Sequence, residues 1–214
     1  MHRLLLRNLV YSLIFILFAS CKTYRLGEVK SFSATQKTIE NSYFSSNKDY
    51  VYKCQMDIYK NHVSGIVIIK KISETAHRVV MTTDFGNKMF DFEISPIDFK
   101  LNYVLPDLNK KMIINFLKND FRALLRQQYD VNESFTDEKN LIFTSIDQNT
   151  SAYLFYDNTS DLFLKKIILT KNNQEKINFI FEAKSPTFAE KIEIQHKDFK
   201  INIRLLQITE NETE

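Results

Sequence analysis

The sequence predicts a mainly β fold with a helical insertion, an α+β arrangement of about eleven antiparallel strands. Three observations predict it. Alternation of apolar and polar residues begins at Asp49, an apolar pattern with helical spacing occupies 107–127, and alternation returns after Val131. Strand side chains alternate between two faces, whereas helical ones repeat about every 3.6 residues, so the two periods separate the elements. No break in composition interrupts 49–208, which we treat as one domain.

The strands before the insertion follow one another through short turns. The first has its apolar side chains on one face and polar ones on the other. The apolar set is Tyr52, Cys54, Met56 and Ile58. Further strands are expected at 66–72, 78–83, 89–94 and 99–103. Because the connections are short, the sheet is expected to be an antiparallel meander.

A Pro-Asp pair indicates the start of the helix, with Asp107 as its N-cap. The apolar residues that follow cover well over half of the helix circumference, so we expect a helix covered on two sides. Asn119 and Asp120 could also cap a second helix, which would divide the segment into 108–118 and 120–127. The sequence leaves both arrangements open.

The second half of the domain again has strand character. Strands are expected at 141–143, 153–156, 163–169, 177–181, 192–194 and 201–205. Residues 209–214 are acidic and are expected to be a disordered tail.

The first twenty residues have the pattern of a secretory signal peptide. Two arginines precede an apolar run, which ends at Ala19 and Ser20, small residues of the kind that a signal peptidase recognises. The run is shorter than the ~20 apolar residues that a membrane-spanning helix needs. The Phe-Ala-Ser-Cys ending resembles the lipobox of bacterial lipoproteins, which implies that Cys21 becomes a lipidated N-terminus. Ordinary secretory cleavage near Ser20 is the alternative.

Residues 21–48 are polar and rich in serine, and we expect a tether that lets the body stand off a membrane. A short helix at about 34–44 is also compatible with the weak periodicity of this segment.

Composition excludes several classes of partner and chemistry. Without the two leader arginines, 27 basic residues face 26 acidic ones, so no basic surface field attracts nucleic acid. The chain has two cysteines, and lipidation of Cys21 would leave Cys54 without a disulfide partner. Cys54 lies on the apolar side of its strand, which predicts a buried and inert thiol rather than a nucleophile.

The chain after the leader shows no reactive constellation. Its histidines are His62, His77 and His196, far apart in sequence and expected in solvated loops. No HExxH, paired CxxC, P-loop or GxSxG pattern is present. Asp91 and Glu93 share one face of a strand and are expected to be solvated. We therefore expect no catalytic residues, no metal and no cofactor, and a function that depends on an apolar cavity or surface.

The domain resembles the Lol family of lipoprotein carriers and receptors. The strand–helix–strand order over 49–208 is the same, the segment 64–68 resembles the second strand of the family, and 105–125 corresponds to its helical lid. The resemblance implies an unclosed antiparallel half-barrel whose lid, at 107–127, covers a hydrophobic cavity. The turn 83–87 lies where the receptors carry a proline-leucine-glycine turn, although here Asp84 replaces the proline and the chain lacks the tryptophan usual in the receptors.

The resemblance also implies a function and its residues. It points to a monomeric outer-membrane lipoprotein that faces the periplasm, is held by an acyl anchor, and accepts acyl chains of lipoproteins or meets a periplasmic carrier. Phe85 and Gly86 would form a membrane-contacting loop, unless Phe85 folds back over the sheet. The expected cavity wall consists of Cys54, Met56, Ile68, Phe90, Phe92, Phe116, Phe121, Phe179, Phe181 and Ile203. The alternatives are a lipid-anchored structural or interaction module with a filled core and, less favoured, an enzyme built around the histidines.

Overall fold

The computed structural model describes residues 23–159 and 162–208. The signal peptide, Cys21 and the expected tail at 209–214 lie outside the described residues. Within the described ranges, no helix is long and apolar enough to span a membrane.

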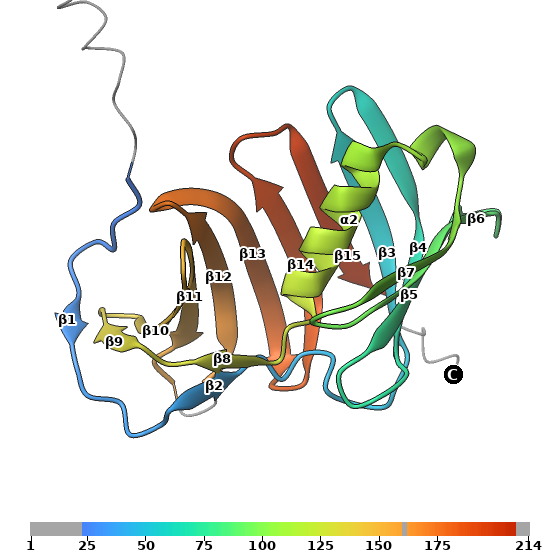
Figure 1. Cartoon of the computed structure of the whole chain (residues 1–214). Coiled ribbons are helices and arrows are strands. Elements are labelled where there is room, and N and C mark those ends of the chain that lie inside the picture. Colours follow the sequence, from blue (N-terminus) through green and yellow to red (C-terminus); the bar gives the residue numbers. More distant parts are fainter. Residues whose placement is uncertain (1–22, 160–161, 209–214) are drawn as a thin grey trace, which may run out of the picture.

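A single antiparallel sheet of thirteen strands forms the body, and it bends around one helix (Figure 1). Its strand order is β1-β9-β10-β11-β12-β13-β14-β15-β3-β4-β5-β6-β7. The last strand therefore pairs with the first long one, so that the two halves of the chain join in the middle of the sheet. The edges β1 and β7 do not pair with each other, which confirms an unclosed half-barrel with a helix on its concave side.

The strand bounds extend the predicted segments by a few residues in most cases. The first half contains β3 (Tyr50–Ile58), β4 (Asn61–Lys71), β5 (His77–Thr82), β6 (Lys88–Ile94) and β7 (Phe99–Val104). The second half contains β10 (Asn140–Asp147), β11 (Thr150–Asp157), β12 (Leu164–Lys171), β13 (Gln174–Ser185), β14 (Phe188–His196) and β15 (Ile201–Gln207). Four short strands were not expected: β1 (Lys30–Ser31), β2 (Thr38–Glu40), β8 (Gln128–Asp130) and β9 (Glu133–Thr136).

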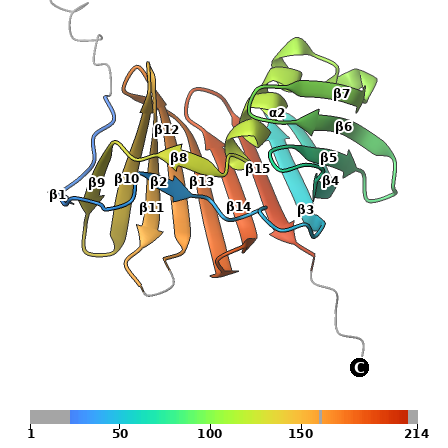
Figure 2. The ribbon, with the colours of Figure 1, turned by 60° about the horizontal axis from the view of Figure 1, so that its bottom comes forward.

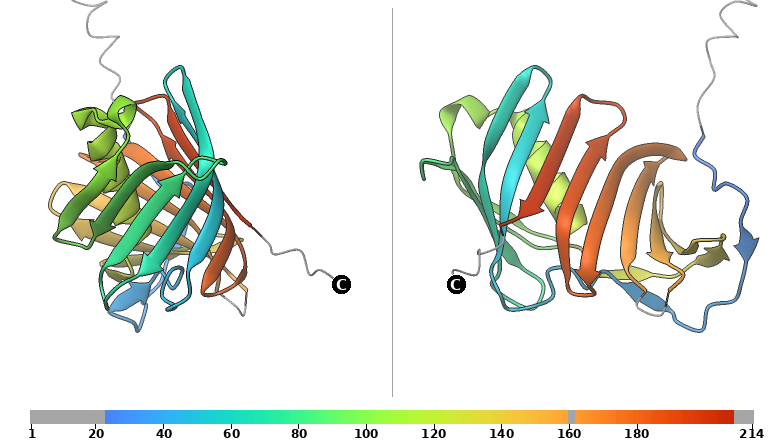
Figure 3. Two further views of the ribbon diagram at one scale, coloured as in Figure 1. Left: turned by 90° about the vertical axis from the view of Figure 1, so that its right-hand side faces the viewer. Right: turned by 180° about the vertical axis from the view of Figure 1, so that it is seen from behind.

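The register of β3 and β4 shows how the pleat builds the core. Cys54 lies opposite Gly65, and its neighbour two residues along, Tyr52, lies opposite Val67. All four are buried on the concave face, while the residues between them point to the convex face. Seen from behind, the strands curve around the helix, which lies on their far side (Figure 3).

The insertion is one helix, α2 (Lys111–Leu124), preceded by the 3₁₀ turn η1 (Pro106–Leu108). Asp107 lies within that turn, and the N-cap position is Lys110, whose side chain makes no capping hydrogen bond. The prediction that Asp107 caps the helix is therefore wrong. The helix is also not covered on two sides, because Met112 on its outer side is 44% exposed.

The segment before β3 runs along the body instead of forming a free tether with a helix. β1 pairs with β9, and β2 pairs with β8 in a separate two-stranded sheet. Figure 2 shows the β2–β8 pair lying across the concave side of the neighbouring strands. Tyr43 and Phe44 are buried in the core, and the Tyr43 hydroxyl donates to the carbonyl of Leu164 at 2.9 Å. The possible helix at 34–44 does not form, because Thr38–Glu40 is a strand that pairs with β8.

His77 joins this segment to the sheet and should make stability depend on pH. Its ring is buried, Nε2 lies 3.2 Å from the carbonyl oxygen of Phe44, and burial lowers the pKa of His77 below its usual value. The unfolded chain then binds more protons just below pH ~6.5, so the free energy of unfolding should fall as pH decreases from about 7.5 to 5.5. Chemical denaturation of the His77→Gln protein over this pH range should show a free energy of unfolding that depends less on pH than that of the wild-type protein.

Candidate functional site

The apolar underside of α2 rests on the concave face of the sheet. The buried side chains of the helix include Ile113, Leu117, Phe121 and Leu124, at the spacing of one helical stripe. Phe121 packs against the rings of Phe90 and Phe92, with ring centroids 6.3 and 5.5 Å away. The helix thus covers the apolar floor that the β strands provide.

The space between helix and sheet is almost filled. A cavity of about 10 Å³ remains beneath the helix. Its lining is Met56, Ile58, Ile113, Phe116, Leu117, Asp120, Ile201 and Ile203. Such a volume holds at most about one water molecule. An acyl chain could enter this seam only if α2 moved away from the sheet.

One buried polar contact fixes the helix over this cavity. Asp120 is fully buried on the underside of α2, and His196, at the end of β14, donates from Nε2 to its Oδ2 at 2.9 Å. The other carboxylate oxygen, Oδ1, is buried without a hydrogen-bond partner. Burial raises the pKa of Asp120, and the contact with His196 acts in the opposite direction. The buried Asp120 carboxylate therefore has His196 as its one hydrogen-bond partner among the described residues. Loss of that partner would leave a buried charge without compensation.

Two further polar contacts hold the C-terminal half of α2. Arg122 donates to the carbonyls of Ser95 and Asp98 in the β6–β7 turn, at 3.0 and 2.9 Å. At the end of the helix, the side-chain amide of Asn41 donates to the carbonyl of Leu124 at 3.1 Å. The helix is thus attached by apolar packing and by a few contacts at identifiable positions.

Most of the expected wall residues lie on the concave face. Phe116 is half-buried and packs edge-on against His196, with ring centroids 5.2 Å apart. Those fully enclosed in the core are Cys54, Met56, Phe90, Phe92, Phe121, Phe179, Phe181 and Ile203.

Ile68 is the one expected wall residue that lies on the wrong face. It is paired with Val51 and Val80, between the inward-pointing Val67 and Ile69. It therefore points to the convex face, and its placement in the wall was wrong. The run 66–69 is apolar at every position, so the sequence offers no alternation from which to choose its faces.

The Cys54 thiol is inaccessible, and we expect it to be unreactive. It is fully buried, and burial raises its pKa to about 12. At pH 8 a maleimide should therefore fail to label Cys54 in the folded protein but should label it in denaturant. Mass spectrometry of the peptide containing Cys54 reads out the result. Rapid labelling of the folded protein would mean that the core opens readily at β3.

The β5–β6 turn presents Phe85 to solvent. The Phe85 side chain is 94% exposed, so it does not fold back over the sheet. Gly86 follows with a φ of +83°, a conformation that glycine adopts without strain. Asp84 is paired with Lys53 at 2.5 Å. An aromatic ring thus projects from a turn whose own charge is neutralised.

The described residues contain no cluster of three metal-binding side chains. The three histidines do not converge: His62 pairs with Asp57 at the surface, while His77 and His196 are buried at different places. The expectation that all three lie in solvated loops was wrong for the latter two.

Asp91 also differs from its expected solvated state. It lies almost fully buried on its strand and accepts two hydrogen bonds from Arg78, at 2.9 and 2.7 Å, and one from Lys88 at 3.0 Å. These hydrogen bonds, that from Arg78 above all, hold the pKa of Asp91 far below its usual range. A carboxylate held in this way neither takes up a proton near neutral pH nor remains free to act as a base.

Comparison with known proteins gives a likeness in fold. No family model and no curated protein sequence matches the chain. A LolA superfamily protein from Nitrosomonas europaea aligns over 75% of this chain and 83% of its own, with a TM-score of 0.51 and 8% identity. An outer membrane lipoprotein-sorting protein domain from Vibrio parahaemolyticus aligns over 79% and 88%, with a TM-score of 0.45 and 9% identity. The first of these alignments shows that the chain has the fold of the LolA superfamily, an open antiparallel half-barrel with a helical lid.

Proposed function

We propose that this protein is a lipid-anchored outer-membrane protein that binds acyl chains, or another hydrophobic ligand, between α2 and the concave face. The observation that carries the proposal is the apolar seam under a helix that has no side-chain hydrogen bond from its N-cap and few polar attachments. Each CH₂ group that leaves water for such a seam gains ~0.8 kcal/mol. The free energy gained by burying an acyl chain of ordinary length would therefore offset the free energy needed to displace the helix.

The proposal includes the anchor and the destination. Acylation of Cys21 would hold the protein at the membrane, where it would receive lipoproteins or lipids from a periplasmic carrier. Three acyl chains exceed the two signals needed for stable anchoring. Such a protein acts as a tethered receptor rather than as a carrier that shuttles freely.

Photo-crosslinking with a diazirine-bearing fatty acid tests the binding site. Incubated with the mature protein in nanodiscs, the probe should label residues on the underside of α2 and on the facing strands. Ile203→Phe, which enlarges a side chain at the cavity, should reduce labelling, whereas the matched Ile68→Phe on the convex face should not. Labelling confined to the convex face would refute the proposed seam.

Phe85 is proposed to enter the acceptor membrane during delivery. Because its ring is almost fully exposed, Phe85→Ser should change the free energy of unfolding by no more than about 0.5 kcal/mol. The same substitution should slow transfer of a fluorescent acyl ligand to acceptor vesicles several-fold, since an aromatic ring partitions into the bilayer interface. Unchanged transfer would remove Phe85 from the mechanism.

A second candidate function is a lipid-anchored interaction module. The filled interior favours it, as does the free edge of β7, where Leu101 and Tyr103 are 37% and 40% exposed. An unpaired strand edge can accept a strand from another protein. Failure of every acyl probe to bind, together with capture of a partner that Tyr103→Lys abolishes, would support this function instead.

A further inference from the structure

The loops at one end of the sheet form a surface beside the point where the described chain begins. The antiparallel order places the β3–β4, β12–β13 and β14–β15 turns at this end, together with the start of α2 (Figure 1). Tyr24 lies here, since its backbone N–H donates to the carbonyl of Asn173 in the β12–β13 turn at 2.6 Å. A chain anchored at Cys21 would therefore reach the body at this end.

An open hollow of about 570 Å³ lies on this surface, next to the β3–β4 and β14–β15 turns. It is lined by Asp57, Tyr59, His196, Lys197, Asp198, Phe199, Lys200 and Asn202. Unlike the small cavity beneath the helix, it is already open in this conformation.

The acids of the hollow are already paired, whereas one of its lysines is not. Asp57 pairs with His62, and Asp198 pairs with Lys176, both at 2.7 Å. Lys200 is exposed and forms no ion pair within the described residues. Lys200 is therefore a cation of the hollow without a neutralising partner, although the chain as a whole is nearly neutral.

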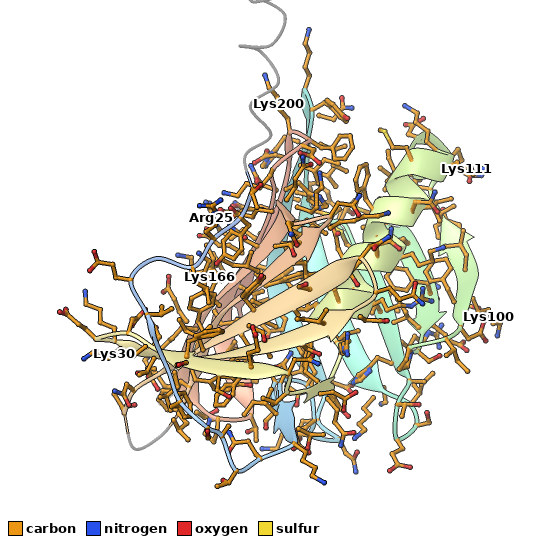
Figure 4. All side chains as sticks on the ribbon, turned by 60° about the vertical axis from the view of Figure 1, so that its left-hand side comes forward. Arg25, Lys30, Lys100, Lys111, Lys166 and Lys200 are labelled. Atoms are coloured by element: carbon orange, nitrogen blue, oxygen red, sulfur yellow. The ribbon has the colours of Figure 1, made fainter. Side chains whose placement is uncertain are left out.

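The rim adds further unpaired cations. Lys60, in the β3–β4 turn, and Lys111, at the start of α2, form no ion pair with any described residue and are exposed. Figure 4 shows Lys111 and Lys200 in the upper part of the molecule, above Lys30 and Lys100. Among the described residues of the hollow and the adjoining turns, the acids without a lysine or arginine partner are Asp57, Asp107 and Asp147. The lysines without an ion pair are more numerous: Lys60, Lys110, Lys111, Lys171 and Lys200.

Apolar side chains lie among these lysines. Tyr59 is 48% exposed and Phe199 is 44% exposed, and both line the hollow. Met112 is exposed one residue beyond Lys111. Lysines that surround partly exposed aromatic rings match the interface of a bilayer, in which anionic phosphates lie beside acyl chains.

We propose that this hollow binds the head group of an anionic phospholipid in the membrane that carries the anchor. Lys200 contacts the phosphate, Lys60 and Lys111 add attraction to the surface, and the rings of Tyr59 and Phe199 meet the acyl boundary. The contact orients the body on the bilayer. The proposal rests on the proposed anchor at Cys21 but not on acyl binding under α2. Its lysines are not part of the acyl seam, although Phe199 packs against Phe116 of α2, with ring centroids 5.1 Å apart.

The absence of tryptophan from the chain permits a direct test. Phe199→Trp, made in the full-length mature protein, places the chain's single tryptophan at the hollow. With the protein anchored in vesicles of brominated phosphatidylcholine, addition of phosphatidylglycerol should quench the fluorescence of this indole, and high salt should reverse the quenching. Ile97→Trp, in a β6–β7 turn at the opposite strand end and 95% exposed, should not be quenched in either vesicle.

Charge variants identify the lysines responsible. Lys200→Gln or Lys60→Gln should each lower the ratio of membrane-contacting to detached protein roughly five-fold, because each lysine near an anionic surface contributes on the order of 1 kcal/mol. Lys139→Gln, in a turn at the opposite end, should have no effect.

Three results would overturn the inference. Equal quenching of the Phe199→Trp protein in neutral and anionic vesicles would remove the role of charge. Release by millimolar phosphate at constant ionic strength would assign the hollow to a soluble anion. If anionic vesicles leave the fluorescence of the introduced indole unchanged and only an added acidic protein changes it, the hollow is a protein interface instead.

Discussion

His196→Ala is expected to lower the free energy of unfolding by about 3–5 kcal/mol. The substitution leaves the Asp120 carboxylate buried under α2 with neither oxygen hydrogen-bonded, since His196 is the sole partner found for Oδ2 among the described residues and Oδ1 has none there. Urea unfolding monitored by circular dichroism measures the loss. Amide exchange should show at the same time that α2 opens faster than the sheet.

The stability lost in His196→Ala should also depend on pH. Burial raises the folded-state pKa of Asp120 above its unfolded value, so the folded state takes up a proton first as pH falls. The decrease in the free energy of unfolding caused by His196→Ala should therefore be largest at neutral pH and smaller in acid. Adding Asp120→Leu should restore most of the stability, because it removes the unpaired charge. A loss that is independent of pH and unaffected by Asp120→Leu would mean that the histidine acts only by packing.

Gly65→Ala is expected to destabilise the protein by about 3 kcal/mol or more, because the new methyl group has no space. A Cβ at this position would lie 1.9 Å from the carbonyl oxygen of Thr82 and 2.9 Å from its carbonyl carbon. These are backbone atoms of β5, so neither can rotate away, and β4 and β5 would have to separate. Thermal unfolding and the yield of soluble protein report the effect.

Gly27→Ala is the matched control for this prediction. No described atom lies within 4 Å of a Cβ at Gly27, so the change should stay within about 0.5 kcal/mol. Wild-type stability of Gly65→Ala would show that β4 and β5 are farther apart than the structure places them.

The core could be predicted from the sequence wherever a strand alternates. Tyr52, Cys54 and Met56 lie on the concave face as expected, because polar residues separate them. Ile68 could not be placed in this way, since its neighbours on both sides are also apolar and the face is decided by pairing with β3 and β5.

The N-terminal segment was misjudged for a different reason. β1 and β2 are two and three residues long, and their hydrogen bonds go to β9 and β8, roughly a hundred residues away. Strands this short carry no periodicity of their own. Only the apolar bulk of Tyr43 and Phe44 could have indicated that this segment belongs to the core.

The buried pair beneath the helix was missed because Asp120 resembled a helix cap. In the sequence it follows Asn119 and precedes an apolar residue, a pattern found at helix starts. The available signal was its position three residues after Leu117, within the apolar stripe. A carboxylate on that stripe needs a buried partner, and the partner, His196, comes from a distant strand end that the sequence does not bring near.

Because the seam under α2 is filled, acyl binding requires the helix to move. In the described residues the space beneath the helix holds about 10 Å³, so the proposed ligand can bind only to a conformation with the helix displaced. The apparent affinity is then reduced by the fraction of molecules in that conformation. His196→Ala, by loosening the helix, should raise acyl affinity while lowering stability.

Quenching of a single tryptophan beneath the helix is the most direct test of acyl binding. Phe121 is fully buried on the underside of α2, and Phe121→Trp would place the chain's only tryptophan against Phe90 and Phe92. Titration of this variant with a brominated fatty acid at micromolar concentration should quench its fluorescence saturably, while the Ile97→Trp protein stays unquenched. The account predicts saturable quenching with competition by an unbrominated acyl chain. Absence of quenching in a folded Phe121→Trp protein would contradict it.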